Sequence, residues 1–204
     1  MRKINKLTPL PHFNGRNYKV DCEVWSCKRC TDITFHSKYP DIYQETRWQI
    51  LVDEQNQQCG YTELYIEKLE ESHIDHYKKR EDFSDLTFDW DNLIVATNDI
   101  NFGAKYKDNI YKIQPHEYGL IFNPVIDHVE NDFYYNEFGM IREDEGRVKK
   151  TVEVFNLNDE YLKARRKKII DMIDSFKNGG LSTLDIKNII EKDGFKSVVE
   201  QYCL

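Results

Sequence analysis

Two short strand-like segments near the middle of the chain constrain the fold more than any other feature. SHIDHY at residues 72–77 and the apolar NLIVA at 92–96 are separated by a polar connection. The segment TNDINFGAK at 97–105 follows, and Thr97 is a suitable cap for a helix there. Strand, connection, strand and helix, with helical segments on both sides, predict an α+β fold.

Helical periodicity brackets this central region. PDIYQETRWQILVDEQ at 40–55 places its apolar residues at helical spacing and begins with residues suited to a first helical turn. The chain is again helical from about Asn156, with one apolar face along residues 158–177. The pair Gly179–Gly180 ends that helix, and Ser182 starts a last one that Gly194 stops.

Composition fits one folded domain. The chain has 204 residues, of which 40% are hydrophobic, and this is enough to bury a core. We expect an N-terminal segment (1–58) packed on a core (59–110), with the region 111–204 belonging to the same domain. No apolar run approaches the roughly 18 residues needed to cross a bilayer, and the first residues lack a signal-peptide block. These features predict a cytoplasmic protein with no membrane partner.

Charge and cysteine usage limit the possible chemistry. A net charge of -7 argues against coating nucleic acid by bulk charge, although residues 147–168 are locally basic. That stretch is either a solvated helix face or a surface for phosphate or an acidic partner. The five cysteines are an odd number, which argues against a disulfide framework. Cys22, Cys27, Cys30 and His36 are either a zinc knuckle or reduced thiols in a polar loop.

The pair Asp75–His76 lies at the end of the first predicted strand. A carboxylate is a hard oxygen ligand for a divalent cation, and a neutral imidazole can deprotonate water near neutral pH. Together they offer what hydrolysis of a phosphodiester needs. The amides of Asn92 and Asn101 further along the chain can ligate a hard metal or hold a loop in shape.

The segments IDH (74–76) and DNL (91–93), followed by Asn101 and Lys105, occur in an order that resembles the ββα-metal motif of HNH nucleases. The resemblance implies a ββα-metal HNH core flanked by N- and C-terminal helices. It also implies that Asp75 and Asn101 bind Mg²⁺ or Mn²⁺ and that His76 is the general base. In the same pattern Asn92 braces the loop between the strands, and Lys105 lies near the scissile phosphate.

Flanking segments narrow the resemblance, which spans residues 1–168. MRKINKL, LVDEQNQQCGYTE, FDWDNLIVATND and TVEVFNLNDEYLKARR occur in an order similar to the PtuB-like nucleases of Septu and retron-associated anti-phage systems. That family implies a PtuA-like SMC/ABC-type ATPase as partner and DNA or tRNA as substrate. In retron systems it also implies a reverse transcriptase with its msDNA.

The sequence departs from the pattern where many HNH proteins bind a structural zinc. Cys59 is present, but Thr62, Thr97 and Ile100 stand where the other three thiolates belong. One thiolate cannot form a tetrahedral zinc site, so we expect no structural zinc at the core. Packing around three side chains has to hold the hairpin instead: Tyr61, Trp90 and Leu93.

Basic residues beside the candidate site have two interpretations. His73, Lys78, Lys79 and Arg80 are candidate contacts for nucleic-acid phosphates. The alternative is that His73 is a hydrogen-bonded strand residue and that 78–80 balance nearby acidic residues. The tyrosine-rich block 131–141 offers either base-stacking surfaces or buried aromatics.

Two functions follow from these features. The first is a metal-dependent HNH endonuclease that acts as the effector of a defence complex. The second is a degenerate HNH fold retained as an adaptor or regulatory subunit, which the missing zinc cysteines favour.

Overall fold

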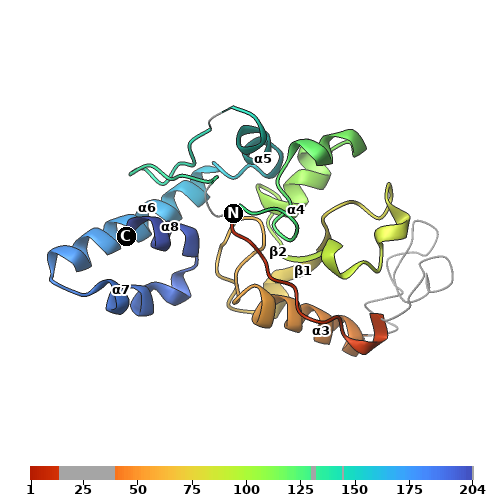
Figure 1. The fold of residues 1–204 in the computed structure, drawn as a ribbon, viewed down its shortest axis with the longest axis horizontal. Helices are drawn as coiled ribbons and strands as arrows, with labels where there is room; N and C mark the ends of the chain where they lie inside the picture. Colours follow the sequence, from red (N-terminus) through yellow and green to blue (C-terminus); the bar gives the residue numbers. More distant parts are fainter. Residues whose placement is uncertain (14–39, 130–131, 144, 204) are drawn as a thin grey trace.

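The structure, a computed structural model, describes residues 1–13, 40–129, 132–143 and 145–203. It is a mixed α+β fold, mostly helical, around one two-stranded antiparallel hairpin (Figure 1). Strand β1 (Ser72–His76) pairs with β2 (Leu93–Thr97), so that Asp75 lies opposite Ile94. The helix α4 (Gly103–Lys105) follows and continues as a π-helical segment, Tyr106–Tyr111. The predicted α+β class is confirmed.

The predicted helix at 40–55 is also confirmed. It consists of α3 (Pro40–Trp48) and a π-helical continuation, Gln49–Glu54. The buried Tyr43 on α3 accepts a hydrogen bond from the backbone N–H of Ile74. The side chain of Gln55 bonds both backbone groups of Val95, at 2.9 and 2.8 Å, and so occupies the outer edge of β2. The N-terminal helix therefore fixes the position of the hairpin.

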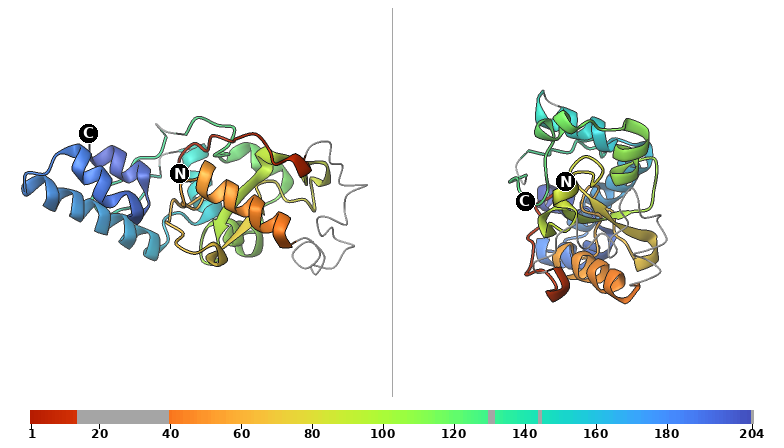
Figure 2. Two further views of the ribbon diagram at one scale, coloured as in Figure 1. Left: turned by 90° about the horizontal axis from the view of Figure 1, so that it is seen from below. Right: turned by 90° about the vertical axis from the view of Figure 1, so that its right-hand side faces the viewer.

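Four helices form the C-terminal part of the molecule. They are α5 (Arg147–Phe155), α6 (Glu160–Asn178), α7 (Thr183–Ile190) and α8 (Lys196–Tyr202). Asp159 caps α6 by accepting from the N–H of Tyr161. Helices α7 and α8 pack on α6 and form a unit at one end of the molecule (Figure 2). Shorter 3-10 turns are Pro11–Phe13, Leu69–Glu71, Ser84–Leu86, Trp90–Asn92, Pro115–Leu120 and Glu191–Asp193.

Two helix boundaries differ from the sequence-based prediction. Thr97 does not cap a helix, because it is the last residue of β2 and pairs with Ser72. The final predicted helix ends at Ile190 rather than Gly194, and neither α5 nor α8 was predicted. Gly194 and Phe195 both have positive φ, 82° and 51°, so the chain reverses there and starts a new helix.

The C-terminal unit is fixed to the core at Glu63. The backbone N–H of Phe195 donates to the Glu63 carbonyl at 2.8 Å, and the Ser197 hydroxyl donates to its buried carboxylate at 2.6 Å. A Cβ at Gly194 would lie 2.6 Å from the Glu63 carbonyl oxygen, so the close approach requires glycine. Among the described residues, no helix is both long and apolar enough to cross a membrane.

Candidate functional site

Asp75 lies buried near the end of β1, with its carboxylate already engaged. Its Oδ2 accepts from the Tyr61 hydroxyl at 2.5 Å and lies 3.2 Å from the Lys107 ammonium. Burial and the Asp75 charge raise the pKa of Tyr61 well above its ordinary value, so the phenol keeps its proton and donates. Asp75 is therefore held by one neutral and one cationic donor.

Lys107, which the sequence analysis did not select, is the cation of this cluster. It lies on the π-helical segment and is fully buried, and its Nζ is 3.2 Å from both Asp75 and Asp108. It also donates to the carbonyls of His76 and Tyr77, at 3.2 and 3.0 Å. Burial alone would lower the Lys107 pKa, but the two carboxylates outweigh it and raise it. Burial and the Asp75 charge raise the pKa of Asp108 to about 6.

His76 is the residue whose geometry suits proton transfer. Its Nε2 lies 3.0 Å from the carbonyl oxygen of Thr87. Because a carbonyl only accepts, Nε2 must carry the proton, which leaves the lone pair of the neutral ring on Nδ1. Burial and the nearby Arg80 charge lower the pKa of His76 to about 4, so the ring is neutral at neutral pH.

Asn92 closes the connection between the strands. Its Oδ1 accepts from the Lys78 N–H at 2.8 Å, and its amide donates to the carbonyls of Lys78 and Leu86 at 3.0 and 3.2 Å. The side chain is buried, and all three hydrogen bonds are partly buried. The loop that carries Thr87 and the basic segment is thus tied to the start of β2.

The basic segment 78–80 lies beside His76 and Asp108. The Lys78 ammonium is 5.3 Å from the centre of the Phe83 ring, and Lys79 Nζ is 3.7 Å from the Asp108 carboxylate. Arg80 is half-buried, and its charge contributes to the lowered His76 pKa. These three cations are therefore held near the site by the loop that Asn92 fixes.

His73 lies on the face of β1 that carries Asp75, and the charge of Lys105 acts on it. His73 and Asp75 are two residues apart in β1, so their side chains point to the same side of the strand. Nδ1 of His73 is buried without a hydrogen-bond partner among the described residues. Burial lowers the His73 pKa, Asp75 opposes this change, and the Lys105 charge adds to it. Lys105 thus lies close enough to act on His73, but the ion pair with Asp75 is made by Lys107.

Asn101 does not lie on the helix as the family pattern requires. It is exposed, precedes Gly103, and donates through its side-chain amide to Asp99 at 2.9 Å. In the described part of the chain no hydrogen bond joins it to Asp75, and no three His, Cys, Asp or Glu residues are grouped to hold a metal ion. With Lys107 on the Asp75 carboxylate, the donors as placed do not fit a divalent cation.

Two of the four positions where HNH proteins carry zinc ligands are in contact here. The Thr97 hydroxyl lies 3.9 Å from the thiol of Cys59, although 38 residues separate them. Tyr61, Trp90 and Leu93 are buried beside the hairpin, and the indole of Trp90 donates to Glu54 at 2.8 Å. Cys22, Cys27, Cys30 and His36 lie outside the described residues.

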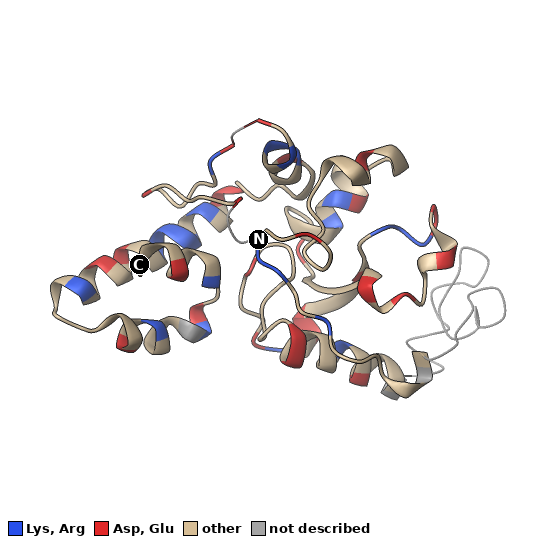
Figure 3. Ribbon diagram, viewed as in Figure 1, with Lys and Arg blue, Asp and Glu red and all other residues tan. Residues whose placement is uncertain are grey.

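The tyrosine-rich block and the basic stretch 147–168 each contain both buried and exposed side chains. In the tyrosine-rich block, Tyr135 is buried and forms a bridge with Ile141, while Phe138 is exposed. On α6, Arg166 is buried and donates to the carbonyls of Gly139 and Leu157, at 2.6 and 2.7 Å. Of the other basic residues of α6, Lys167, Lys168 and Lys177 are exposed, while Lys163 and Arg165 are half-buried. Figure 3 shows where the Lys and Arg positions lie along that helix.

No protein-family model matches the chain, and no curated protein matches it significantly.

Proposed function

We propose that this protein is an HNH-type nuclease that hydrolyses phosphodiester bonds of DNA or tRNA. One observation carries the proposal: the neutral ring of His76 is oriented by the Thr87 carbonyl, beside a basic loop that Asn92 holds. The order of hairpin and helix, and the contact between Cys59 and Thr97, agree with the same family pattern.

In the proposed reaction, Nδ1 of His76 takes a proton from water as the water oxygen attacks phosphorus. The bond from phosphorus to the 3′ oxygen breaks, and solvent returns a proton to that oxygen. The products are a 5′-phosphate and a 3′-hydroxyl. In this proposal Lys78 and Arg80 offset charge on the phosphate in the transition state.

The family resemblance implies a requirement for Mg²⁺ or Mn²⁺. That ion would need an arrangement of ligands different from the one in which the structure holds Asp75 and Asn101. Lys107 would have to leave Asp75 before that carboxylate could bind a divalent cation. Its ammonium has four oxygen neighbours and no exposed surface, so this change is costly.

The second candidate function is a degenerate HNH fold that acts as an adaptor subunit. Two observations favour it: Lys107 holds Asp75 from within the core, and threonines replace zinc-ligand positions at 62 and 97. Such a subunit would keep the fold and its partner without cleaving nucleic acid.

We also propose a partner of the PtuA-like SMC/ABC-type ATPase class, together with a reverse transcriptase and msDNA in a retron setting. The net charge of -7 supports the need for a partner, because an acidic chain captures nucleic acid poorly by itself. The exposed basic side chains of α6 are available to that partner or to the substrate.

A nuclease assay with a matched histidine control tests the proposal. Wild type, His76→Ala and His116→Ala are incubated with plasmid DNA and total tRNA in Mg²⁺, Mn²⁺ or EDTA, each with and without the ATPase. We expect His76→Ala to lose about 10²- to 10⁴-fold of the cleavage rate, while replacement of the exposed His116 has no effect. Cleavage unaffected by His76→Ala would refute the proposed base. No cleavage under any condition, with ATPase binding retained, would favour the adaptor.

A further inference from the structure

Four oxygen atoms converge on the ammonium group of Lys107. Its Nζ lies 3.2 Å from the carboxylates of both Asp75 and Asp108, and 3.2 and 3.0 Å from the backbone carbonyls of His76 and Tyr77. The lysine has no exposed surface. We call these four oxygens the oxygen cage. They come from the end of β1 and from the π-helical segment that follows α4, so the fold itself brings them to one point.

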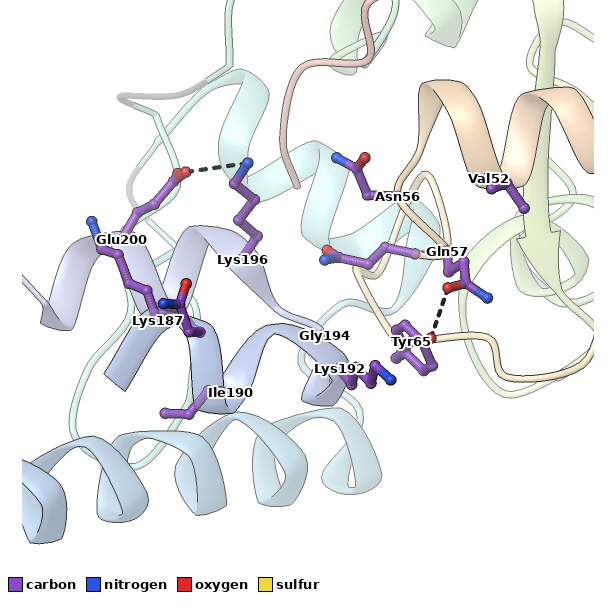
Figure 4. A pocket seen from close by; sticks show the side chains of 13 residues that line it. Val52, Asn56, Gln57, Tyr65, Lys187, Ile190, Lys192, Gly194, Lys196 and Glu200 are labelled. Carbon is purple, nitrogen blue, oxygen red and sulfur yellow. Dashed lines mark hydrogen bonds and ion pairs between the residues drawn. The ribbon is translucent and has the colours of Figure 1, made fainter. Parts of the chain in front are cut away.

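The cavity where the C-terminal unit meets the core shows the contrary arrangement. Its volume is about 730 Å³, and the segments 52–65 and 187–200 line it (Figure 4). Lys187 and Lys192 both belong to its lining, but Figure 4 shows their side chains extending in opposite directions. The charges of the cavity therefore define no single position for a ligand, whereas the oxygen cage defines one position for a cation.

The oxygen cage has the chemistry of a divalent-cation site. Carboxylates and backbone carbonyls are hard oxygen ligands, and calcium sites in proteins combine both kinds with water. The ammonium of Lys107 is a compact cation, and its distances to the four oxygens lie at the long end of the range of about 2.7–3.2 Å for N–H···O hydrogen bonds. Lys107 therefore occupies, with its own charge, a position whose oxygen atoms suit a metal ion.

We propose that Lys107 is a built-in cation that takes the place of a metal ion at the end of β1. The inference rests on the proposed function in one respect, because the family pattern assigns a metal ion to Asp75. The ammonium offsets both carboxylates of the cage and binds the carbonyl of His76, so it acts as a positioning residue for the strand end that carries that imidazole. A metal ion and the ammonium cannot share the cage, because both require the same four oxygens.

Calcium titration of a chain without this lysine tests the inference. Lys107→Ala removes the ammonium and leaves the four oxygens with space for an ion and water. Such a site should bind calcium with a Kd on the order of 10⁻⁴–10⁻³ M. At constant ionic strength, about 10 mM calcium should then raise the thermal unfolding midpoint of Lys107→Ala by about 3–10 °C. Wild type and the exposed control Lys149→Ala, which loses the same charge, should shift by less than about 1 °C.

Replacement of Asp75 separates binding in the cage from binding elsewhere. Lys107→Ala/Asp75→Asn should bind calcium at least about ten-fold more weakly than Lys107→Ala, because a charged ligand is lost. Equal calcium responses of these two variants, or no response from folded Lys107→Ala, would refute the cage as a cation site. If Lys107→Ala is unfolded without calcium, refolding on addition of calcium supports the inference.

Calorimetry of the wild type gives a second test that does not depend on the folding of Lys107→Ala. We expect no calcium or magnesium binding that Asp75→Asn abolishes. Binding that Asp75→Asn does abolish would show that the lysine yields the cage to a metal ion, and the inference would fall. All these measurements are made without nucleic acid. A failed calcium response therefore leaves the role of His76 in cleavage untouched, and an absence of cleavage leaves the calcium result unchanged.

Discussion

Lys107 and Lys192 are both lysines near a site, but their surroundings are opposite. Lys107 is fully buried and has four oxygen neighbours, two from carboxylates and two from backbone carbonyls. Lys192 is exposed at the edge of the cavity and forms no ion pair within the described residues. A buried charge needs partners to offset its lost hydration, while an exposed charge keeps its water.

This difference separates structural lysines from lysines that can bind a ligand. The partners of Lys107 are all supplied by the fold, so a ligand would have to displace them. Lys187 and Lys192 form no ion pair within the part of the chain that the structure describes, so their ammonium groups keep their water. The same reasoning favours His76 over the Asp75–Lys107 cluster as the base of the proposed reaction.

Replacing Lys107 should produce the largest effect. Lys107→Met leaves the Asp75 and Asp108 carboxylates in the core without their cation, and we expect a loss of about 3–5 kcal/mol in the free energy of unfolding. Urea denaturation measures it, with the exposed Lys149→Met as control. The double variant Asp75→Asn/Lys107→Met should regain part of the loss. A change in Lys107→Met below about 1 kcal/mol would show that the cluster is not needed for folding.

Lowering the pH should destabilise the folded protein through protonation of His76. Its folded pKa of about 4 lies below the ordinary value near 6.5, so the unfolded chain takes up the proton first as the pH falls. The stability linked to a neutral His76 is complete above about pH 6.5 and lost toward pH 4, by up to about 3 kcal/mol. Asp108 acts in the opposite direction, because its folded pKa is raised to about 6 and its protonation favours the folded state.

A comparison of wild type with His76→Gln isolates this contribution, because both proteins keep Asp108. Urea denaturation between about pH 7 and pH 4.5 should show a smaller loss of stability in His76→Gln. Parallel pH curves for the two proteins would contradict the lowered pKa of His76.

Replacing Gly194 by alanine should lower the stability more than replacing Gly180, although both glycines have positive φ. Gly180→Ala adds only backbone strain, about 1 kcal/mol, since nothing lies within 4 Å of its Cβ position. Gly194→Ala adds the collision with the Glu63 carbonyl, and we expect at least about 1 kcal/mol more. Thermal unfolding of both variants measures the difference. Equal costs would mean that the C-terminal unit does not depend on this close approach, and the cavity would then be less well defined.

The sequence predicted the parts of the fold that depend on local periodicity. The strands at 72–77 and 92–96 and the helix at 40–55 follow from a strand-like segment, a short apolar run and apolar residues at helical spacing. Thr97 was misassigned because a threonine before a turn also suits the end of a strand, and here pairing with Ser72 decided the outcome. The separation of α7 and α8 depends on Phe195 adopting a left-handed backbone, which its residue type does not indicate.

Contacts between distant segments could not be predicted in the same way. Lys105 and Lys107 are two positions apart, and only the three-dimensional packing shows that Lys107 reaches Asp75. Asn101 matched the family pattern in sequence, yet the helix begins after it, at Gly103. The cavity joins segments more than 120 residues apart, so no local pattern could have indicated it.

The smallest expected effect is on the stability of the cavity variant. Lys187→Gln/Lys192→Gln removes two charges that have no ion pair among the described residues, so the free energy of unfolding should change by less than about 0.5 kcal/mol. Urea denaturation of this variant beside Lys107→Met gives the direct contrast between the two kinds of lysine. A large loss of stability in the cavity variant would mean that these lysines support the fold, and the contrast with Lys107 would disappear.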